Sequence, residues 1–87
     1  NNDTIIYAAW DGHTEIVKLL LTDPRVNPAA QDNYAIRLAA EYGRTEVVKL
    51  LLNDPRVNPA AENNDAIRLA ANNGHTEVVK ELILDGR

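Results

Sequence analysis

The sequence of 87 residues lacks cysteine, methionine, phenylalanine and serine, and it contains a single tryptophan. The absence of cysteine excludes a disulfide framework and a cysteine-based zinc site. The absence of serine as well as cysteine removes two side chains that enzymes use as nucleophiles. The four glycines stand singly, so there is no glycine-rich loop to bind a phosphate group. We therefore expect a protein that is not an enzyme and binds no cofactor.

The chain also has no strong basic charge and no long hydrophobic run. Nine basic and thirteen acidic residues give a net charge of −4, whereas nucleic-acid binding needs a concentrated basic face. The apolar runs are far shorter than a membrane span, and no signal-peptide segment opens the sequence. We expect a soluble, monomeric, intracellular protein, cytoplasmic in location, with no nucleic-acid or membrane partner.

An internal repeat is the strongest feature of the sequence. Gly12, Gly43 and Gly74 recur with a period of 31, and residues 12–30 and 43–61 differ at only three of nineteen positions. A fixed period of this size is typical of a solenoid built from stacked units. We predict one domain over residues 1–87, with units at about 1–31, 32–62 and 63–87.

Each unit has the pattern of two short helices. Residues 35–42 are rich in helix-forming residues, and Gly43 can close that helix in the left-handed conformation. Thr45 is the predicted N-cap of a second, more apolar helix that includes residues 47–52. Asp54-Pro55 ends this helix because proline cannot continue the hydrogen-bond ladder. The following residues are predicted to form an extended connector rather than a strand.

These motifs resemble the ankyrin repeat family over essentially the whole chain. Residues 34–40 (Tyr-Ala-Ile-Arg-Leu-Ala-Ala) lie where that family has Thr-Pro-Leu-His-Leu-Ala-Ala, and residues 43–52 match its Gly-His-x-x-Val-Val-x-Leu-Leu-Leu segment. The resemblance implies an all-α, ankyrin-like solenoid of three helix-turn-helix repeats. Because the family's usual period is 33, we expect short connecting loops or vestigial β-turns instead of full β-hairpins. Arg37 and Arg68 replace the signature histidine.

The terminal units differ from the middle one. Glu81 takes the place of Leu19 and Leu50, which predicts that the third unit is a cap with a polar outer face. At the other end, Ile6 and Tyr7 replace the arginine and leucine of the later units. The missing initial methionine also predicts a processed product or a piece excised from a longer array.

Positions that vary between otherwise identical units are candidates for binding a partner. In proteins that this chain resembles, such positions line a concave strip formed by inter-repeat turns and first helices. The predicted partner-binding residues are Trp10, Asp11, Tyr34, Glu41, Tyr42, Arg44, Asp65, Asn72 and Asn73. Tryptophan, tyrosine and arginine dominate interface hot spots, and several aspartates on the strip favour a partner with a basic surface. Alternatively, these positions diverge because nothing constrains them, with Trp10 simply packing on Tyr42.

Two other sets of residues have competing interpretations. The Arg37 and Arg68 side chains could bind a carboxylate of a ligand or, as we favour, pair with an acidic residue and join adjacent units. His13 and His75 occupy one repeat position that holds Arg44 in the middle unit. A metal ligand or catalytic base is not expected to be replaced by arginine, so we predict no metal site and assign these histidines to hydrogen bonds with the turn between helices.

The leading hypothesis is therefore a protein-interaction module. The alternative is a designed or excised repeat scaffold with no evolved partner, which the near-identity of the units and the absence of methionine and cysteine permit.

Overall fold

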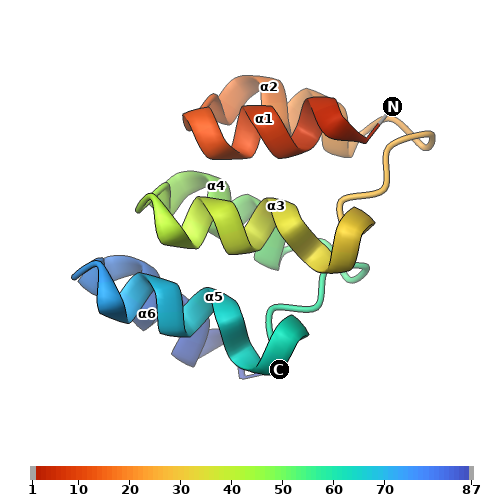
Figure 1. Ribbon diagram of the computed structural model, residues 1–87. Helices are drawn as coiled ribbons and strands as arrows, with labels where there is room; N and C mark the ends of the chain where they lie inside the picture. The colour runs from red at the N-terminus through yellow and green to blue at the C-terminus, as the bar shows by residue number, and fades with distance from the viewer. Residues whose placement is uncertain (1, 87) are drawn as a thin grey trace.

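The computed structural model describes residues 2–86, and this part of the chain contains six α-helices and no strand. The helices are α1 (Asp3–Asp11), α2 (Thr14–Leu21), α3 (Ala30–Glu41), α4 (Thr45–Leu52), α5 (Ala61–Asn72) and α6 (Thr76–Asp85). They form three helix pairs stacked in one direction, with α1, α3 and α5 in one row and α2, α4 and α6 in a second row behind it (Figure 1). The predicted all-α solenoid of helix pairs joined by short loops is confirmed.

A glycine between the two helices of each pair produces the sharp turn. Gly12, Gly43 and Gly74 have φ values of 75°, 71° and 74°, in the left-handed region that glycine adopts at little cost. Gly43 has a second reason to lack a side chain, because a Cβ there would lie 2.6 Å from the His75 ring of the next unit. The prediction for Gly43 is confirmed, but the predicted N-cap is wrong. Helix α4 begins at Thr45 itself, and no side chain caps it.

The exposure of equivalent residues shows how the pairs stack. Ile16 is 46% exposed, whereas its equivalents Val47 and Val78 are 1% and 0% exposed. This position therefore faces the preceding unit, which α2 lacks. Val48 faces the other way, since it is buried while its equivalent Val79 in the last unit is only partly buried. Burying a valine fully is worth about 1.5–3 kcal/mol, so contacts between units hold the array together.

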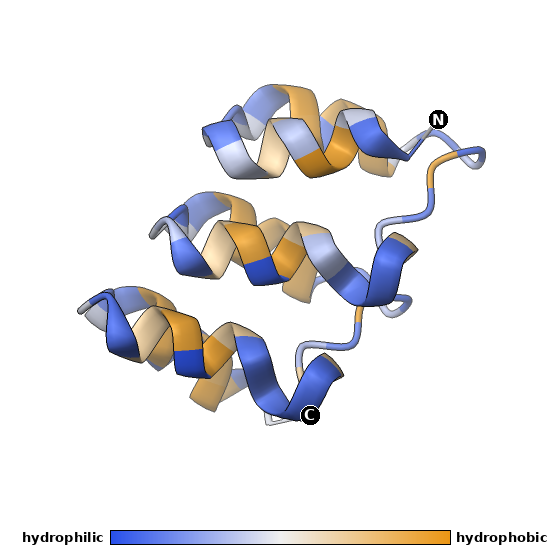
Figure 2. Ribbon diagram, viewed as in Figure 1, coloured by the Kyte–Doolittle hydropathy of each residue, from blue (hydrophilic) through white to orange (hydrophobic). Residues whose placement is uncertain are grey.

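Hydrophobic residues gather where the helices of the stack face one another, and hydrophilic residues occupy the turns and most of the connectors (Figure 2). Within residues 2–86, no helix combines the length and the apolar character that crossing a membrane requires.

Glu81 does not cap the end of the stack as predicted. It is partly buried and lines a shallow cleft between α4 and α6 together with Lys49 and Leu52. Its repeat position faces the preceding unit, and this is why Leu19 in the first unit is 71% exposed. The far side of α6 instead exposes an apolar residue, Ile83, at 64%.

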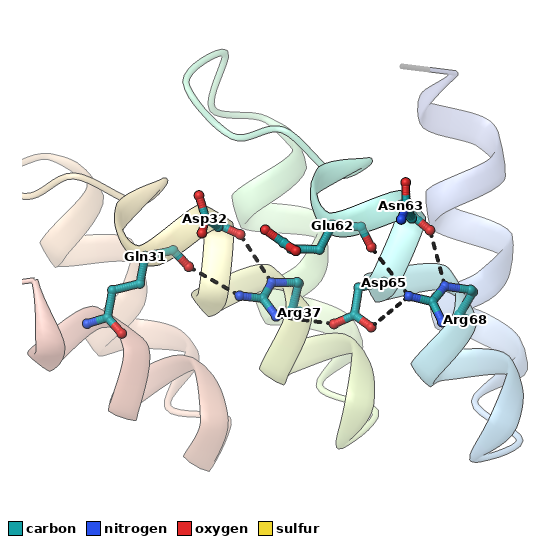
Figure 3. A network of polar contacts seen from close by, with 7 residues as sticks. All are labelled: Gln31, Asp32, Arg37, Glu62, Asn63, Asp65 and Arg68. Carbon is teal, nitrogen blue, oxygen red and sulfur yellow. Dashed lines mark hydrogen bonds and ion pairs between the residues drawn. The ribbon is translucent and has the colours of Figure 1, made fainter.

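A left-handed turn that the sequence analysis did not predict opens α3 and α5. Residues 31–33 and 62–64 all have φ between 55° and 61°, although none is glycine. Such a conformation costs a non-glycine residue roughly 1–2 kcal/mol. Arg37 offsets part of this cost, because its Nε donates to Asp32 O at 3.1 Å and its Nη2 donates to Gln31 O at 3.2 Å (Figure 3). The arginine that replaces the family's histidine therefore holds this turn.

The asparagine side chains at positions 2 and 33 each accept a hydrogen bond from the connector of their own unit. Asn33 is 8% exposed, and its Oδ1 accepts a hydrogen bond of 2.8 Å from the backbone N–H of Asn58. Asn2 accepts the equivalent bond of 2.7 Å from Asn27. Asn64 has the same backbone conformation as Asn33 but is exposed. Asparagine fits this position because it tolerates the left-handed region and its short side chain accepts a hydrogen bond.

The Asp-Pro-Arg segments form compact turns within the connectors. The Asp23 carboxylate accepts hydrogen bonds from the side chain and the backbone N–H of Arg25, and these bonds lower the pKa of Asp23 from 3.8 to about 2. In the next connector, Arg56 also donates from Nη1 to Val26 O at 2.9 Å. This bond links one connector to the one before it.

Candidate functional site

A cleft of about 500 Å³ lies between α1 and α3. We call it the aromatic cleft, and its lining residues are Ile6, Tyr7, Trp10, Tyr34, Leu38, Glu41 and Tyr42. The lining includes all four aromatic residues of the chain, since the sequence holds one tryptophan, three tyrosines and no phenylalanine. Four aromatic side chains collected from two units mark this cleft as distinct from the rest of the surface.

Helix geometry places these residues on facing sides of α1 and α3. Tyr7 and Trp10 are three positions apart in α1, and Tyr34, Leu38 and Glu41 follow a spacing of four and three in α3. Side chains at such spacings lie on one face of a helix. The stacking of the first unit on the second then brings the two faces together.

The aromatic rings remain accessible although they contact one another. The Trp10 and Tyr42 ring centroids are 5.9 Å apart with planes tilted by 40°, so the predicted packing between these residues occurs. Nevertheless Trp10, Tyr42 and Tyr7 are 41%, 44% and 57% exposed. The contact therefore leaves ring surface open to a ligand.

Within residues 2–86, Glu41 is the single carboxylate that lines the aromatic cleft. Its backbone carbonyl accepts hydrogen bonds from Asn73 Nδ2 at 3.3 Å and His75 Nε2 at 2.9 Å. No hydrogen bond or ion pair to another described residue engages its carboxylate. The cleft therefore combines exposed aromatic faces with one negative charge.

Asp65, a predicted partner-binding residue, instead joins two units (Figure 3). Its Oδ2 lies 3.2 Å from Arg37 Nη1, and its Oδ1 lies 3.3 Å from Arg68 Nη2. The side chains of Asp65 and Arg37 are each 19% exposed. For Arg37 this agrees with the preferred interpretation of a pair with an acidic residue between units, whereas Arg68 pairs with Asp65 within α5.

Arg44 and Asn73 also bond to the preceding unit. Arg44 Nε donates to Trp10 O at 2.8 Å, and Asn73 Nδ2 donates to Glu41 O. His75, at the repeat position of Arg44, makes the matching bond to Glu41 O. The hydrogen bond predicted for the histidines is therefore made, for His75, to the end of α3 in the preceding unit, beside the turn between α3 and α4.

Asp11 and Asn72, the remaining predicted residues, lie at the exposed ends of α1 and α5. Neither lines the aromatic cleft. Asp11 Oδ2 is 3.9 Å from His13 Nε2, and both side chains are more than half exposed. Among the described residues, no group of three or more histidine or acidic side chains is placed to hold a metal ion.

Ile6, Tyr7 and Leu38 line the cleft but are not among the residues predicted to bind a partner. Ile6 and Tyr7 did depart from the arginine and leucine of the later units, and this departure was the available signal. It was interpreted as an effect of the chain end. Leu38 gave no signal, because its equivalent in the third unit is also leucine.

Stacked helix pairs that recur every 31 residues, with connectors on one side, define a helical repeat protein. Residues 5–87 match the family model for ankyrin repeats in three copies, so the chain belongs to the ankyrin repeat family. Ankyrin repeats are generally non-catalytic modules for protein–protein interaction. A comparison with curated protein sequences gives no significant match.

Proposed function

We propose that the chain binds a partner protein through the aromatic cleft between α1 and α3. The observation that carries this proposal is the collection of every aromatic side chain of the protein in one cleft, with substantial ring surface still exposed. Tryptophan and tyrosine supply large contact areas at low cost in side-chain entropy and dominate binding hot spots.

The neighbouring contacts support a rigid binding surface. Arg44, in the second unit, donates a hydrogen bond to the backbone carbonyl of Trp10 in the first. His75 and Asn73, in the third unit, donate hydrogen bonds to the backbone carbonyl of Glu41 in the second. These bonds fix the ends of α1 and α3, where Trp10, Glu41 and Tyr42 stand. A preorganised surface loses less entropy when a partner binds. The role that we propose for Arg44 and Asn73 is therefore to position the cleft rather than to contact the partner.

A peptide-display selection on the purified protein tests this function. Sequences enriched on the wild-type chain are synthesised and titrated against wild type, Trp10→Ala and Tyr42→Ala, with circular dichroism to verify the fold. We expect each variant to bind at least about tenfold more weakly, which corresponds to the loss of about 1.4 kcal/mol.

Leu19→Ala and Ile83→Ala are the matched controls, because these residues are 71% and 64% exposed and lie outside the aromatic cleft. We expect both to bind the peptides like the wild type. Selected peptides that bind equally well to the Trp10 and Tyr42 variants would refute the proposal. That result would favour a repeat scaffold without a binding function at this cleft.

A further inference from the structure

We propose that the aromatic cleft receives an arginine side chain of the partner protein. This inference rests on the proposed function and specifies the chemistry that the cleft recognises. The floor of the cleft is apolar, since Ile6 and Leu38 are 4% and 9% exposed, whereas its accessible walls are aromatic rings. The face of an aromatic ring carries negative electrostatic potential and attracts a cation.

The charge of the cleft fits the same ligand. No lysine or arginine within residues 2–86 lines it, and Glu41 contributes a carboxylate that no described residue neutralises. The two nearby guanidinium groups already have partners, and Arg37 also lies over one face of the Tyr34 ring. Arg37 pairs with Asp65, and Arg44 bonds to Trp10 O and lies against Gly12 at the end of α1. An incoming cation therefore meets an uncompensated negative charge.

The protein already contains a guanidinium held in this manner. The Arg37 guanidinium carbon lies 5.0 Å from the centroid of the Tyr34 ring, and its Nη1 lies 3.2 Å from the Asp65 carboxylate. The aromatic cleft offers an external guanidinium the same two elements, exposed rings and the carboxylate of Glu41. A planar guanidinium can stack on a ring while it donates to a carboxylate, and the compact ammonium group of lysine fits this combination less well.

Titration with matched pentapeptides tests the inference by nuclear magnetic resonance on the 87-residue protein. The probe is acetylated Gly-Ala-Arg-Ala-Gly amide, and its controls carry citrulline, the neutral isostere, or lysine at the central position. We expect saturable shifts of the Trp10 indole and Tyr42 ring signals, with a dissociation constant on the order of a few millimolar for so small a ligand. The citrulline peptide should bind about tenfold more weakly, because it offers no charge to the rings or to Glu41. The lysine peptide should fall between them.

Glu41→Gln should reduce affinity for the arginine peptide several-fold and leave the affinity for the citrulline peptide unchanged. Glu77→Gln, at an exposed carboxylate of α6, should change neither. Equal binding of the arginine and citrulline peptides, or tighter binding of the lysine peptide, would overturn the arginine assignment while the cleft remained a binding site. Absence of any shift at the cleft would also overturn it, whereas the proposed function is decided separately by the peptide selection.

Discussion

Replacing Arg37 by alanine should destabilise the fold more than the same replacement of Arg68. Both arginines donate two hydrogen bonds to carbonyls of the left-handed turn in their own unit. Unlike Arg68, Arg37 also lies over an aromatic ring, that of Tyr34, and forms an ion pair with Asp65 of the next unit. The Arg37 side chain is 19% exposed, compared with 59% for Arg68. Both variants therefore lose the hydrogen bonds to the left-handed turn, but Arg37→Ala also loses the ring contact and the ion pair between units.

The magnitudes follow from these contacts. Two partly solvated hydrogen bonds contribute about 1–2 kcal/mol to the free energy of unfolding, and this loss is common to Arg37→Ala and Arg68→Ala. The ion pair with Asp65 adds about 1 kcal/mol, and the contact with Tyr34 adds about 0.5–1 kcal/mol. We expect losses of about 3 kcal/mol for Arg37→Ala and about 1.5 kcal/mol for Arg68→Ala, the latter including its weaker, exposed pair with Asp65.

Urea denaturation followed by far-ultraviolet circular dichroism measures this difference. With a slope of about 1 kcal/mol per molar urea for a chain of this size, the two midpoints should lie about 1–2 M apart. Asp65→Asn is the internal control, because it weakens both ion pairs but leaves the bonds to the left-handed turns. It should cost about 1 kcal/mol. A loss for Arg68→Ala that equals or exceeds that for Arg37→Ala would refute the assignment of Arg37 as a link between units.

Three further predictions concern the turns and the connectors. Gly43→Ala should lower the midpoint of thermal unfolding more than Gly74→Ala. Both substitutions place alanine in the left-handed region. Only at Gly43 would the new Cβ also meet an imidazole, that of His75 in the following unit. Asn33→Ala should cost about 2 kcal/mol in urea unfolding because it leaves a connector N–H without its acceptor, while Asn64→Ala, which removes no such bond, should cost less than half as much. The carboxyl of Asp23 should titrate at about pH 2 by nuclear magnetic resonance. Since its pKa is lowered by folding, its stabilising bonds are present above the ordinary pKa of 3.8 and are lost as the pH falls towards 2; an unshifted titration would contradict this turn.

The repeat made most of the fold predictable from the sequence. Near-identity between units fixes the same helix pair in each, and single glycines mark the turns, so the register of the stack follows from the period of 31. Which side of each helix contacts the preceding unit and which contacts the following unit was not predictable, because a stacked helix is apolar on both sides. This explains the wrong assignment of Glu81, whose position faces the preceding unit and not the end of the array.

The left-handed turns could not be derived from helix propensity. Gln31 and Glu62 favour right-handed helix, and both have positive φ because the turn is held by bonds from outside it. Asparagine at the equivalent positions 33 and 64 was the signal that could have revealed them, since asparagine enters the left-handed region more readily than most residues.

The candidate site was predictable in part. Trp10, Tyr34, Glu41 and Tyr42 were selected because they vary between units, and the structure brings all four to one cleft. Variation does not distinguish a binding residue from one that adapts to its neighbour. Asp65 also varies between units, yet it forms an ion pair with Arg37. This pair can be recognised only from the three-dimensional structure.

The central claim is that the first unit packs on the second so that their aromatic residues form one cleft. Nuclear Overhauser effects between the ring protons of Trp10 and Tyr42 test it most directly. With centroids 5.9 Å apart, the two rings should give clear cross-peaks in the free protein. Helical cross-peaks within α1 and α3 without any between these two rings would contradict the account.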